Sequence, residues 1–394
     1  MSSSPPGAAG PLHGITVLDL STVGPAARCT RLLADYGADV VKVGPVPGRG
    51  PGAVVAPPHA YSAGRGTRQV RLDLRHDAGR QAFLSLAAGA DVVVESFRPG
   101  VVDRLGIGYQ AVRAVNESIV YVSTSGYGQD GPRSDWAGHD LDYLAVGGYL
   151  AMSGRAEDGL PALPGATVAD AAGGGLHGAL AVCAALVRRA ANGEGAYLDV
   201  AAADGVLWMM SLAVEEHMGT GTAIRPGHDV LSGRYACYRA YRTADGRFVA
   251  VAAIEAKFFA NLCRALDLDR YIESQYDETS QDELRHALAE AFLRRTRDEW
   301  VAELAGADTC VAPVLEIEEV ASDAHFAGRG AFVEARHPSL GPLRQLGGLL
   351  AGMAPPAVPV LLPDPGVSDS AALLRAAGMS APLLASLLEA GVVA

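Results

Sequence analysis

A histidine and an aspartate stand side by side in Gly138-His139-Asp140, at the start of a helix that the sequence predicts over residues 141–152. The pKa of an imidazole suits proton transfer near neutrality, and the free N–H groups of a helix N-terminus can stabilise an enolate oxygen. His139 could therefore move a proton beside an oxyanion site. The alternative is that Asp140 merely caps the helix and that His139 fills a gap.

Asp170 is a second candidate for proton transfer, at the start of an Ala-rich helix predicted over residues 170–191. Gly173-Gly174-Gly175 follow in its first turns, and each glycine costs about 1 kcal/mol of helix stability relative to alanine. We therefore expect a ligand or another backbone to approach closely there. Asp170 could act as a base or as a nucleophile, although an aspartate at this position is more commonly an N-cap.

Two further side chains could support this chemistry. Glu255 follows a predicted strand and begins a predicted helix, where a lone glutamate usually complements the helix dipole; bound to an imidazole, it would orient the ring and raise its basicity. Arg98, within Ser96-Phe97-Arg98-Pro99-Gly100, could bind a phosphate. A single arginine of this kind is more often surface charge.

Residues 126–131 match the pattern GxGxxG after a predicted strand. In dinucleotide-binding proteins this motif opens a helix whose N-terminus binds the pyrophosphate. Here Pro132-Arg133-Ser134-Asp135 continues as a loop. We therefore reject a dinucleotide site and expect a glycine-rich loop that lies close to another ligand or to neighbouring backbone.

Short β-branched runs alternate with helical segments in the first 125 residues. The sequence Gly37-Ala38-Asp39-Val40-Val41 recurs as Gly89-Ala90-Asp91-Val92-Val93. This alternation predicts a doubly wound parallel sheet. After residue 217 the pattern changes to a hairpin around Ala244-Asp245-Gly246 and to a capping box of Thr296 with Glu299. The predicted strands are 15–20, 39–43, one that begins within 89–93, 118–123, 196–200, two over 234–254, and 309–315. The predicted helices are 25–36, 77–88, 141–152, 170–191, 205–217, 255–266, 282–295 and 381–390.

The fold class that follows is α/β, with a large Rossmann-like domain of doubly wound parallel sheet and a smaller α+β domain. We assign residues 1–12 to a loose N-terminal tail, 13–217 to the first part of the large domain and 230–329 to the small domain. Residues 330–394, with a Pro-rich stretch over 338–365, return to complete the large domain. The last helix should pack on the large domain.

Composition excludes several classes of protein. The 394 residues are 49% hydrophobic and 19% charged, which is typical of a globular chain. Lys and Arg total 32 against 44 Asp and Glu, and the resulting charge of −12 disfavours nucleic acid as a partner. Five scattered cysteines indicate a reducing compartment. With neither a signal peptide nor a long apolar run in the sequence, we expect a cytoplasmic protein without a membrane span.

Several segments together resemble the family III CoA-transferase (CaiB/BaiF) superfamily, which includes the α-methylacyl-CoA racemases. The likeness spans almost the whole chain, and the Gly138-His139-Asp140 and Ala253-Ile254-Glu255 segments resemble the racemase branch. The other segments that carry it are 11–20, 33–43, 96–100, 105–106, 125–128, the segment around Asp170, and 245–251.

The resemblance implies that His139, supported by Glu255, and Asp170 exchange protons on opposite faces of the α-carbon of a 2-methylacyl-CoA thioester, through an enolate. Asp140, next to His139, is a further predicted catalytic residue. It implies an interlocked homodimer in which Glu255 comes from the other chain. We expect neither a metal nor a cofactor beyond the CoA of the acyl-CoA substrate. The residues that we predict to contact CoA are Lys42, Arg98, Tyr127, Gly128 and Tyr143.

Two other functions remain open at this stage. In the transferases of the same family the residue that matches Asp170 is a nucleophile, which forms an aspartyl anhydride while CoA passes from a thioester to a free carboxylate. An acyl-CoA-binding protein that keeps the fold without turnover is the third possibility. Asp170 suits both enzymes, whereas His139 is informative for the racemase alone.

Overall fold

The computed structural model describes residues 10–48, 57, 59–347, 351, 353, 359–364 and 366–394. They form two compact units. The first unit contains the described part of Met1–Tyr149, together with Pro164–Leu212 and Ala324–Ala394, and the second contains Leu150–Leu163 and Ala213–Asp323. Residues 1–9 of the expected N-terminal tail lie outside the described residues, whereas the Leu12 N–H donates to the Tyr36 carbonyl at 3.0 Å.

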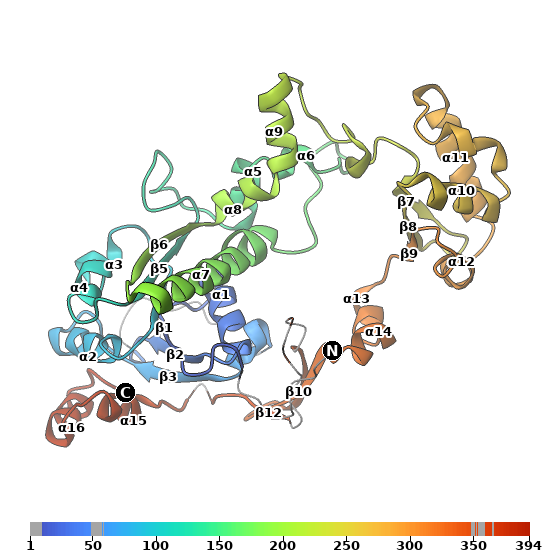
Figure 1. Ribbon diagram of the computed structural model, residues 1–394. Helices are drawn as coiled ribbons and strands as arrows, with labels where there is room; N and C mark the ends of the chain where they lie inside the picture. The colour runs from blue at the N-terminus through green and yellow to red at the C-terminus, as the bar shows by residue number, and fades with distance from the viewer. Residues whose placement is uncertain are drawn as a thin grey trace. The chain divides into compact units, whose positions relative to one another are not determined.

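Six strands form an entirely parallel sheet in the first unit, in the order β3-β2-β1-β4-β5-β6 (Figure 1). The doubly wound sheet predicted from the sequence is confirmed, with β3 as a strand that the prediction missed. Parallel strands end at one edge, and the order reverses between β1 and β4, where open sheets of this kind bind ligands. The strands are β1 (Thr16–Asp19), β2 (Asp39–Gly44), β3 (Thr67–Arg71), β4 (Val92–Glu95), β5 (Val120–Ser125) and β6 (Ala196–Ala201).

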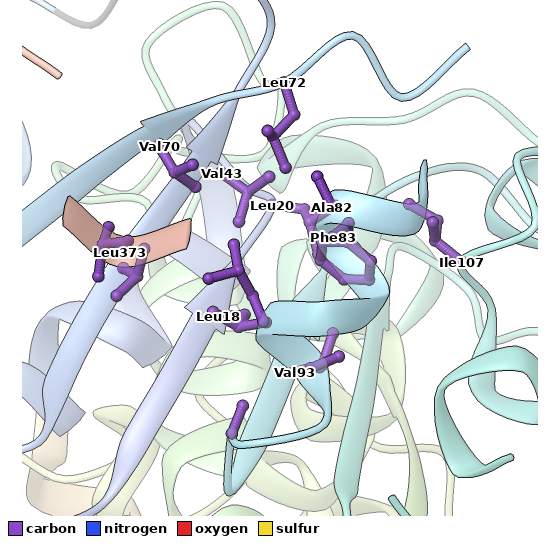
Figure 2. Packing of buried hydrophobic residues seen from close by; sticks show 14 of the residues in the cluster. Leu18, Leu20, Val43, Val70, Leu72, Ala82, Phe83, Val93, Ile107 and Leu373 are labelled. Carbon is purple, nitrogen blue, oxygen red and sulfur yellow. The ribbon is translucent and has the colours of Figure 1, made fainter. Parts of the chain in front are cut away.

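Adjacent residues of each strand point to opposite faces of the sheet. Val17 belongs to a core cluster with Cys29 and Leu33 of α1 (Gly24–Asp35) and with Val182 of α7 (His177–Asn192). Leu18, one residue later, belongs to the cluster on the other face, which contains Phe83 of α2 (Asp77–Ala87) and is drawn in Figure 2. Helices therefore cover both faces.

The C-terminal helices α15 (Ser370–Ala376) and α16 (Ala381–Glu389) belong to the first unit. Leu373, Leu384 and Leu387 lie in the same cluster as Leu18. Figure 1 shows the two helices, and Figure 2 shows Leu373 and Leu18. Val393 pairs with Leu72 beside β3. The expectation that the last helix packs on the large domain is confirmed.

The helix expected to begin at Asp170 starts instead as a π-helix, Ala169–Leu176, which continues into α7. Its glycines allow close packing: a Cβ atom on Gly174 would lie 2.4 Å from Cβ of Pro25 in α1, and one on Gly173 would lie 2.6 Å from the carbonyl oxygen of Ala202 in α8 (Ala202–Met209). The close approach expected here is therefore made by backbone and side chains of two neighbouring helices.

The combined run Ala169–Asn192 has the length and hydropathy of a membrane span, which is weak evidence because core helices of soluble proteins pass the same test. Its residues Ala179, Val182 and Leu186 lie in the core cluster against the sheet. Burial of these side chains explains the apolar composition of the face toward the sheet, whereas Leu180 and Val187 of the same run are exposed.

The prediction of a single helix over 141–152 is also wrong. The structure has α5 (Asp140–Val146) and α6 (Tyr149–Met152), separated by Gly147 and Gly148, and Gly148 has φ +87°. That backbone conformation favours glycine and ends α5. The helix expected over 205–217 is also divided, at Met210, into α8 and α9 (Ser211–Thr220).

In the second unit, β7 (Tyr238–Arg242), β8 (Phe248–Ala252) and β9 (Val311–Pro313) form an antiparallel sheet. Their apolar side chains share a core with α10 (Ala256–Ala265), α11 (Gln281–Phe292) and α12 (Arg297–Leu304). The capping box predicted at the start of α12 is confirmed, because the Thr296 N–H donates to Glu299 at 2.9 Å and the Glu299 N–H donates to Thr296 Oγ1 at 3.4 Å.

Strands also occur near the Pro-rich stretch predicted over 338–365, part of which lies outside the described residues. β10 (Phe332–His337) pairs antiparallel with β11 (Gly341–Leu346) and parallel with β12 (Val360–Leu361). The remaining α-helices are short: α3 (Val101–Arg104), α4 (Tyr109–Arg113), α13 (Ile317–Val320) and α14 (Ala324–Gly328).

The packing of the π-helix makes a testable prediction. Gly173→Ala should lower the free energy of unfolding by about 1–3 kcal/mol, because the backbone carbonyl of Ala202 cannot move aside as a flexible side chain could. Urea unfolding of the variant and of Gly89→Ala measures this. Gly89 is the matched control, since it is exposed and the nearest atom to its added Cβ would be 4.0 Å away. Equal stability of Gly173→Ala and the parent would contradict the account.

Candidate active site

A cavity of about 480 Å³ lies at the carboxyl ends of β4 and β5. The loops that follow these strands form its wall, together with the start of α5. The structure thus brings together four residues predicted separately from the sequence: Arg98, Tyr127, His139 and Tyr143. The other residues that line the cavity are Ser96, Phe97, Pro99, Ser125, Gly126, Ser134, Trp136, Ala137, Gly138 and Asp142.

Aromatic rings form one side of this cavity. The Tyr127 ring meets Tyr143 edge-on at 5.2 Å and Trp136 at 5.9 Å between ring centroids. The Tyr143 hydroxyl donates to the Gly138 carbonyl at 2.6 Å, and burial raises the pKa of Tyr143 to about 12. A Cβ atom on Gly126 would lie 2.2 Å from the Tyr143 ring, so glycine is needed there. This wall is therefore uncharged at neutral pH.

His139 is the N-cap residue of α5, and its exposed side chain lines the cavity. The Asp142 carboxylate accepts a hydrogen bond from the His139 backbone N–H at 2.9 Å, which fixes the entry to the helix. Asp140 is thus not the N-cap. Its Oδ1 accepts a hydrogen bond from the Asp170 backbone N–H at 2.9 Å, so this carboxylate links α5 to the π-helix.

Asp170 lies in the first turn of the π-helix and is half-buried. Burial raises the pKa of its carboxyl group and the negative charge of Asp140 raises it further, while the positive charges of Arg28 and His139 act in the opposite direction. Asp170 is therefore within electrostatic reach of His139. Two groups that are able to take up and release a proton thus lie in one region, and one of them has a carboxyl pKa above the ordinary value.

The other predicted site residues have different surroundings. Lys42 forms an ion pair with the buried carboxylate of Asp19, Nζ to Oδ2 at 2.5 Å, and lines a second cavity of about 220 Å³. The Gly128 N–H donates to Ser125 Oγ at 2.9 Å. Glu255 belongs to the second unit, where it is the N-cap residue of α10. The CoA contacts predicted for Lys42 and Gly128, and the catalytic role predicted for Glu255, stay predictions.

Two residues near the site were missed by the sequence analysis. Glu95 is buried at the end of β4, accepts a hydrogen bond from the Phe97 N–H at 2.7 Å, and has a pKa that burial raises to about 7. It thereby holds the loop that carries Arg98. Arg28 lies in α1, and its positive charge acts to lower the pKa of Asp170. Arg28 has the position of an ordinary surface arginine in an amphipathic helix. The sequence therefore gives no signal that its charge acts on Asp170.

Other polar clusters belong to the scaffold. Gly227-His228-Asp229 has the same sequence as Gly138-His139-Asp140. There His228 Nε2 lies 2.7 Å from Glu216 Oε1, and Asp229 caps a short helix. Across the described residues, no group of three or more His, Cys, Asp or Glu side chains is arranged to hold a metal ion.

Comparison with known proteins identifies the family. The model of CoA-transferase family III matches residues 12–368. The chain belongs to CoA-transferase family III. It is 34% identical to the alpha-methylacyl-CoA racemase of Mus musculus over 374 residues, which are 94% of each protein. It is 30% identical to the succinyl-CoA:glutarate CoA-transferase of Homo sapiens, over 84% of this chain and 78% of that protein.

A solved structure shows the same fold. The CAIB/BAIF family protein from Brucella suis aligns with a TM-score of 0.77 and 25% identity, covering 94% of this chain and all of that one. Family III enzymes among these relatives act on CoA thioesters, as racemases or as transferases. The protein is thus an enzyme of the family III type, whose cavity brings together Arg98, Tyr127, His139 and Tyr143.

The contact between Asp140 and Asp170 predicts the pH dependence of this family III enzyme. In Asp140→Asn the amide oxygen can still accept the Asp170 N–H, but the negative charge that raises the pKa of Asp170 is gone. The pKa of Asp170 should fall, so that, in the direction of reaction in which Asp170 acts as the base, the acidic limb of the profile of kcat/KM against pH moves to lower pH. Asp77→Asn, at an exposed aspartate of α2, is the control. An unchanged acidic limb, or a shift of this limb to higher pH, would disprove its assignment to Asp170.

Proposed function

We propose that the protein racemises 2-methylacyl-CoA thioesters, by removing the α-proton to give an enolate and returning a proton to the opposite face. The observation that carries the proposal is the coupling of His139 with Asp170, beside a carboxylate of Asp140 that binds the Asp170 backbone. Racemisation needs two proton carriers, because the proton leaves one face and a proton arrives at the other. A transferase needs only one nucleophile.

The two carriers exchange roles with the direction of reaction. In one direction the neutral imidazole of His139 takes the α-proton and protonated Asp170 donates its proton to the other face; in the reverse direction Asp170 is the base. The raised pKa of Asp170 suits this use, because a carboxyl group of ordinary pKa would rarely be protonated at neutral pH.

Negative charge accumulates on the thioester oxygen when the α-proton leaves. The N–H groups of Asp140 and Leu141 lie in the first turn of α5 and have no hydrogen-bond partner among the described residues. We assign them to this oxygen, since donors that point at a developing oxyanion lower the barrier. His139 is thereby placed next to the oxyanion donors by its N-cap position.

CoA serves as the part of the substrate by which the enzyme binds it, and the proposal requires neither a metal nor another cofactor. Arg98 lines the cavity and has the charge to bind a CoA phosphate. Tyr127 and Tyr143 offer an uncharged wall for the pantetheine arm. Lys42 and the loop around Gly128 are assigned to CoA as well, with Lys42 also engaged by Asp19.

We further propose that the enzyme works as an interlocked homodimer, in which Glu255 of the partner subunit orients His139. Large apolar side chains on the helices of the first unit support an association surface: Leu180 is 69%, Val187 72% and Trp208 78% exposed. Contiguous exposed apolar surface commonly marks a protein interface. A glutamate that binds the imidazole would hold its orientation and raise its basicity.

A CoA-transferase is the second candidate, favoured by the 30% identity to the glutarate transferase. In that reaction the Asp170 carboxylate would attack the thioester carbonyl, form a mixed anhydride and release CoA as thiolate. The acceptor carboxylate would then displace the donor acid from the carboxyl carbon of Asp170, giving a second anhydride. The CoA thiolate would attack the acceptor carbonyl of this anhydride, which forms the new thioester and frees the Asp170 carboxylate. His139 would have no proton-transfer role in this scheme.

Proton NMR in heavy water separates the two functions. We expect the wild-type protein to exchange the α-proton of 2-methylbutanoyl-CoA for deuterium and to scramble its configuration, at a rate independent of added carboxylate. Protein inactivated by heat is the control for uncatalysed exchange. Formation of a new thioester only when a carboxylate acceptor is present, without α-proton exchange, would establish the transferase and overturn the racemase proposal.

A further inference from the structure

Arg28 packs directly against the π-helix that carries Asp170. A Cβ atom on Gly175 would lie 2.8 Å from Cβ of Arg28 and 2.9 Å from the carbonyl oxygen of Asp170, so glycine makes room for the arginine. The positive charge of Arg28 reaches the Asp170 carboxylate electrostatically, although the two form no ion pair. Arg28 is therefore a neighbour of the reacting groups that leaves the Asp170 carboxylate free.

Two contacts fix the guanidinium group of Arg28. Its Nη2 donates to Thr167 Oγ1 at 2.5 Å, and its Cζ lies 5.4 Å from the centroid of the Tyr61 ring. Tyr61 is itself held, because its hydroxyl oxygen accepts the Gly24 N–H at 2.9 Å. A guanidinium group that lies over an aromatic ring and is hydrogen-bonded at one end is preorganised to bind a planar anion.

The backbone beneath Tyr61 is strained. Tyr61, Ser62 and Ala63 have φ values of +48°, +55° and +50°, in the left-handed region that side chains with a Cβ atom disfavour. Such strain persists only where surrounding contacts impose it, and it clusters at ligand-binding and active sites. The strained turn places the Tyr61 ring against Arg28.

Arg28 has hydrogen-bonding capacity that the protein does not use. The Nε atom is buried and has no hydrogen-bond partner, and the bond to Thr167 is the only one that the guanidinium makes to a described residue. The side chain is half-buried, and no described carboxylate pairs with it. A buried donor without a partner is rare in folded proteins. Nη1, which burial does not seal off and which makes no hydrogen bond to a described residue, is the group that can bind an acceptor supplied by a ligand.

We propose that Arg28 binds a carboxylate carried by the acyl group, so that the substrates are CoA monothioesters of short 2-methyl dicarboxylic acids. The inference rests on the proposed racemase function and names its substrate class. Because Arg28 is a neighbour of Asp170, the carboxylate stands only a few bonds from the α-carbon. Arg28 thus determines specificity, while His139 and Asp170 transfer the protons.

Two acyl-CoAs of matched shape test this specificity by calorimetric binding. In 2-methylsuccinyl-CoA, with the thioester next to the methyl-bearing carbon, a carboxylate occupies the place that an isopropyl group takes in 2,4-dimethylpentanoyl-CoA. The wild-type protein should bind the carboxylate compound roughly ten- to hundred-fold more tightly, as is typical of hydrogen bonds to charged groups. Racemisation leaves either compound available as a ligand throughout the titration.

Arg28→Gln should abolish this preference by weakening the carboxylate compound alone, with affinity for the neutral compound kept within about threefold. Retained affinity for the neutral compound also shows that the variant is folded. Arg28→Lys, which keeps the charge but loses the planar fork, should retain part of the preference. Arg80→Gln, which removes an arginine that pairs with Asp77 in α2, is the matched control and should retain all of it.

Equal affinity of the wild-type protein for both compounds would overturn the inference. So would an equal loss for both in Arg28→Gln, which would place Arg28 on a CoA phosphate or in a purely electrostatic role beside Asp170. These binding results do not depend on turnover. Absence of α-proton exchange with both compounds, together with a preserved preference for the carboxylate, would disprove the racemase function and leave the assignment of Arg28 standing.

Discussion

The hydrogen bond from the Asp170 backbone N–H to Asp140 Oδ1 is the contact on which the site depends. It joins two segments far apart in the sequence, the start of α5 and the first turn of the π-helix. The same carboxylate raises the pKa of the Asp170 side chain through its charge. A single group thus affects both the position of Asp170 and the protonation of its carboxyl group, which we propose as one proton carrier. The residue before Asp140 is His139, which we propose as the other.

The packing around the π-helix makes this contact possible. Gly173 and Gly174 allow α8 and α1 to approach the π-helix, and Gly175 admits Arg28. Each glycine weakens a helix taken alone, so the intrinsic preference of the segment is offset by tertiary contacts. The wider π-helical winding at Ala169–Leu176 coincides with the site, as is common for such turns.

Much of the fold could be predicted because its signals are local. The repeated Gly-Ala-Asp-Val-Val wording precedes buried parallel strands, whose residues are apolar on both faces. β3 was missed because Thr67–Arg71 is a polar edge strand with a single fully buried residue, Val70. The helix over 141–152 was predicted without a break because its apolar spacing continues through Gly147 and Gly148, and only the φ of Gly148 ends it.

The candidate site could be predicted in part for the same reason. His139, Asp140 and Asp170 stand at helix starts, where their residue types already indicate chemistry. Arg28 carries no such signal, because its role comes from contacts with Thr167 and Tyr61 that lie 139 and 33 positions away in the chain. Long-range packing of this kind is not visible in the local sequence.

The central claim is that His139 and Asp170 serve opposite faces of one α-carbon. Deuterium exchange by His139→Ala and Asp170→Asn, measured separately on the two enantiomers of a 2-methylacyl-CoA, tests it most directly. Neither variant should racemise, and each should still exchange the α-proton of one enantiomer with retention of configuration, the two variants acting on opposite enantiomers. Racemisation by either variant, or exchange of the same enantiomer by both, would contradict the claim.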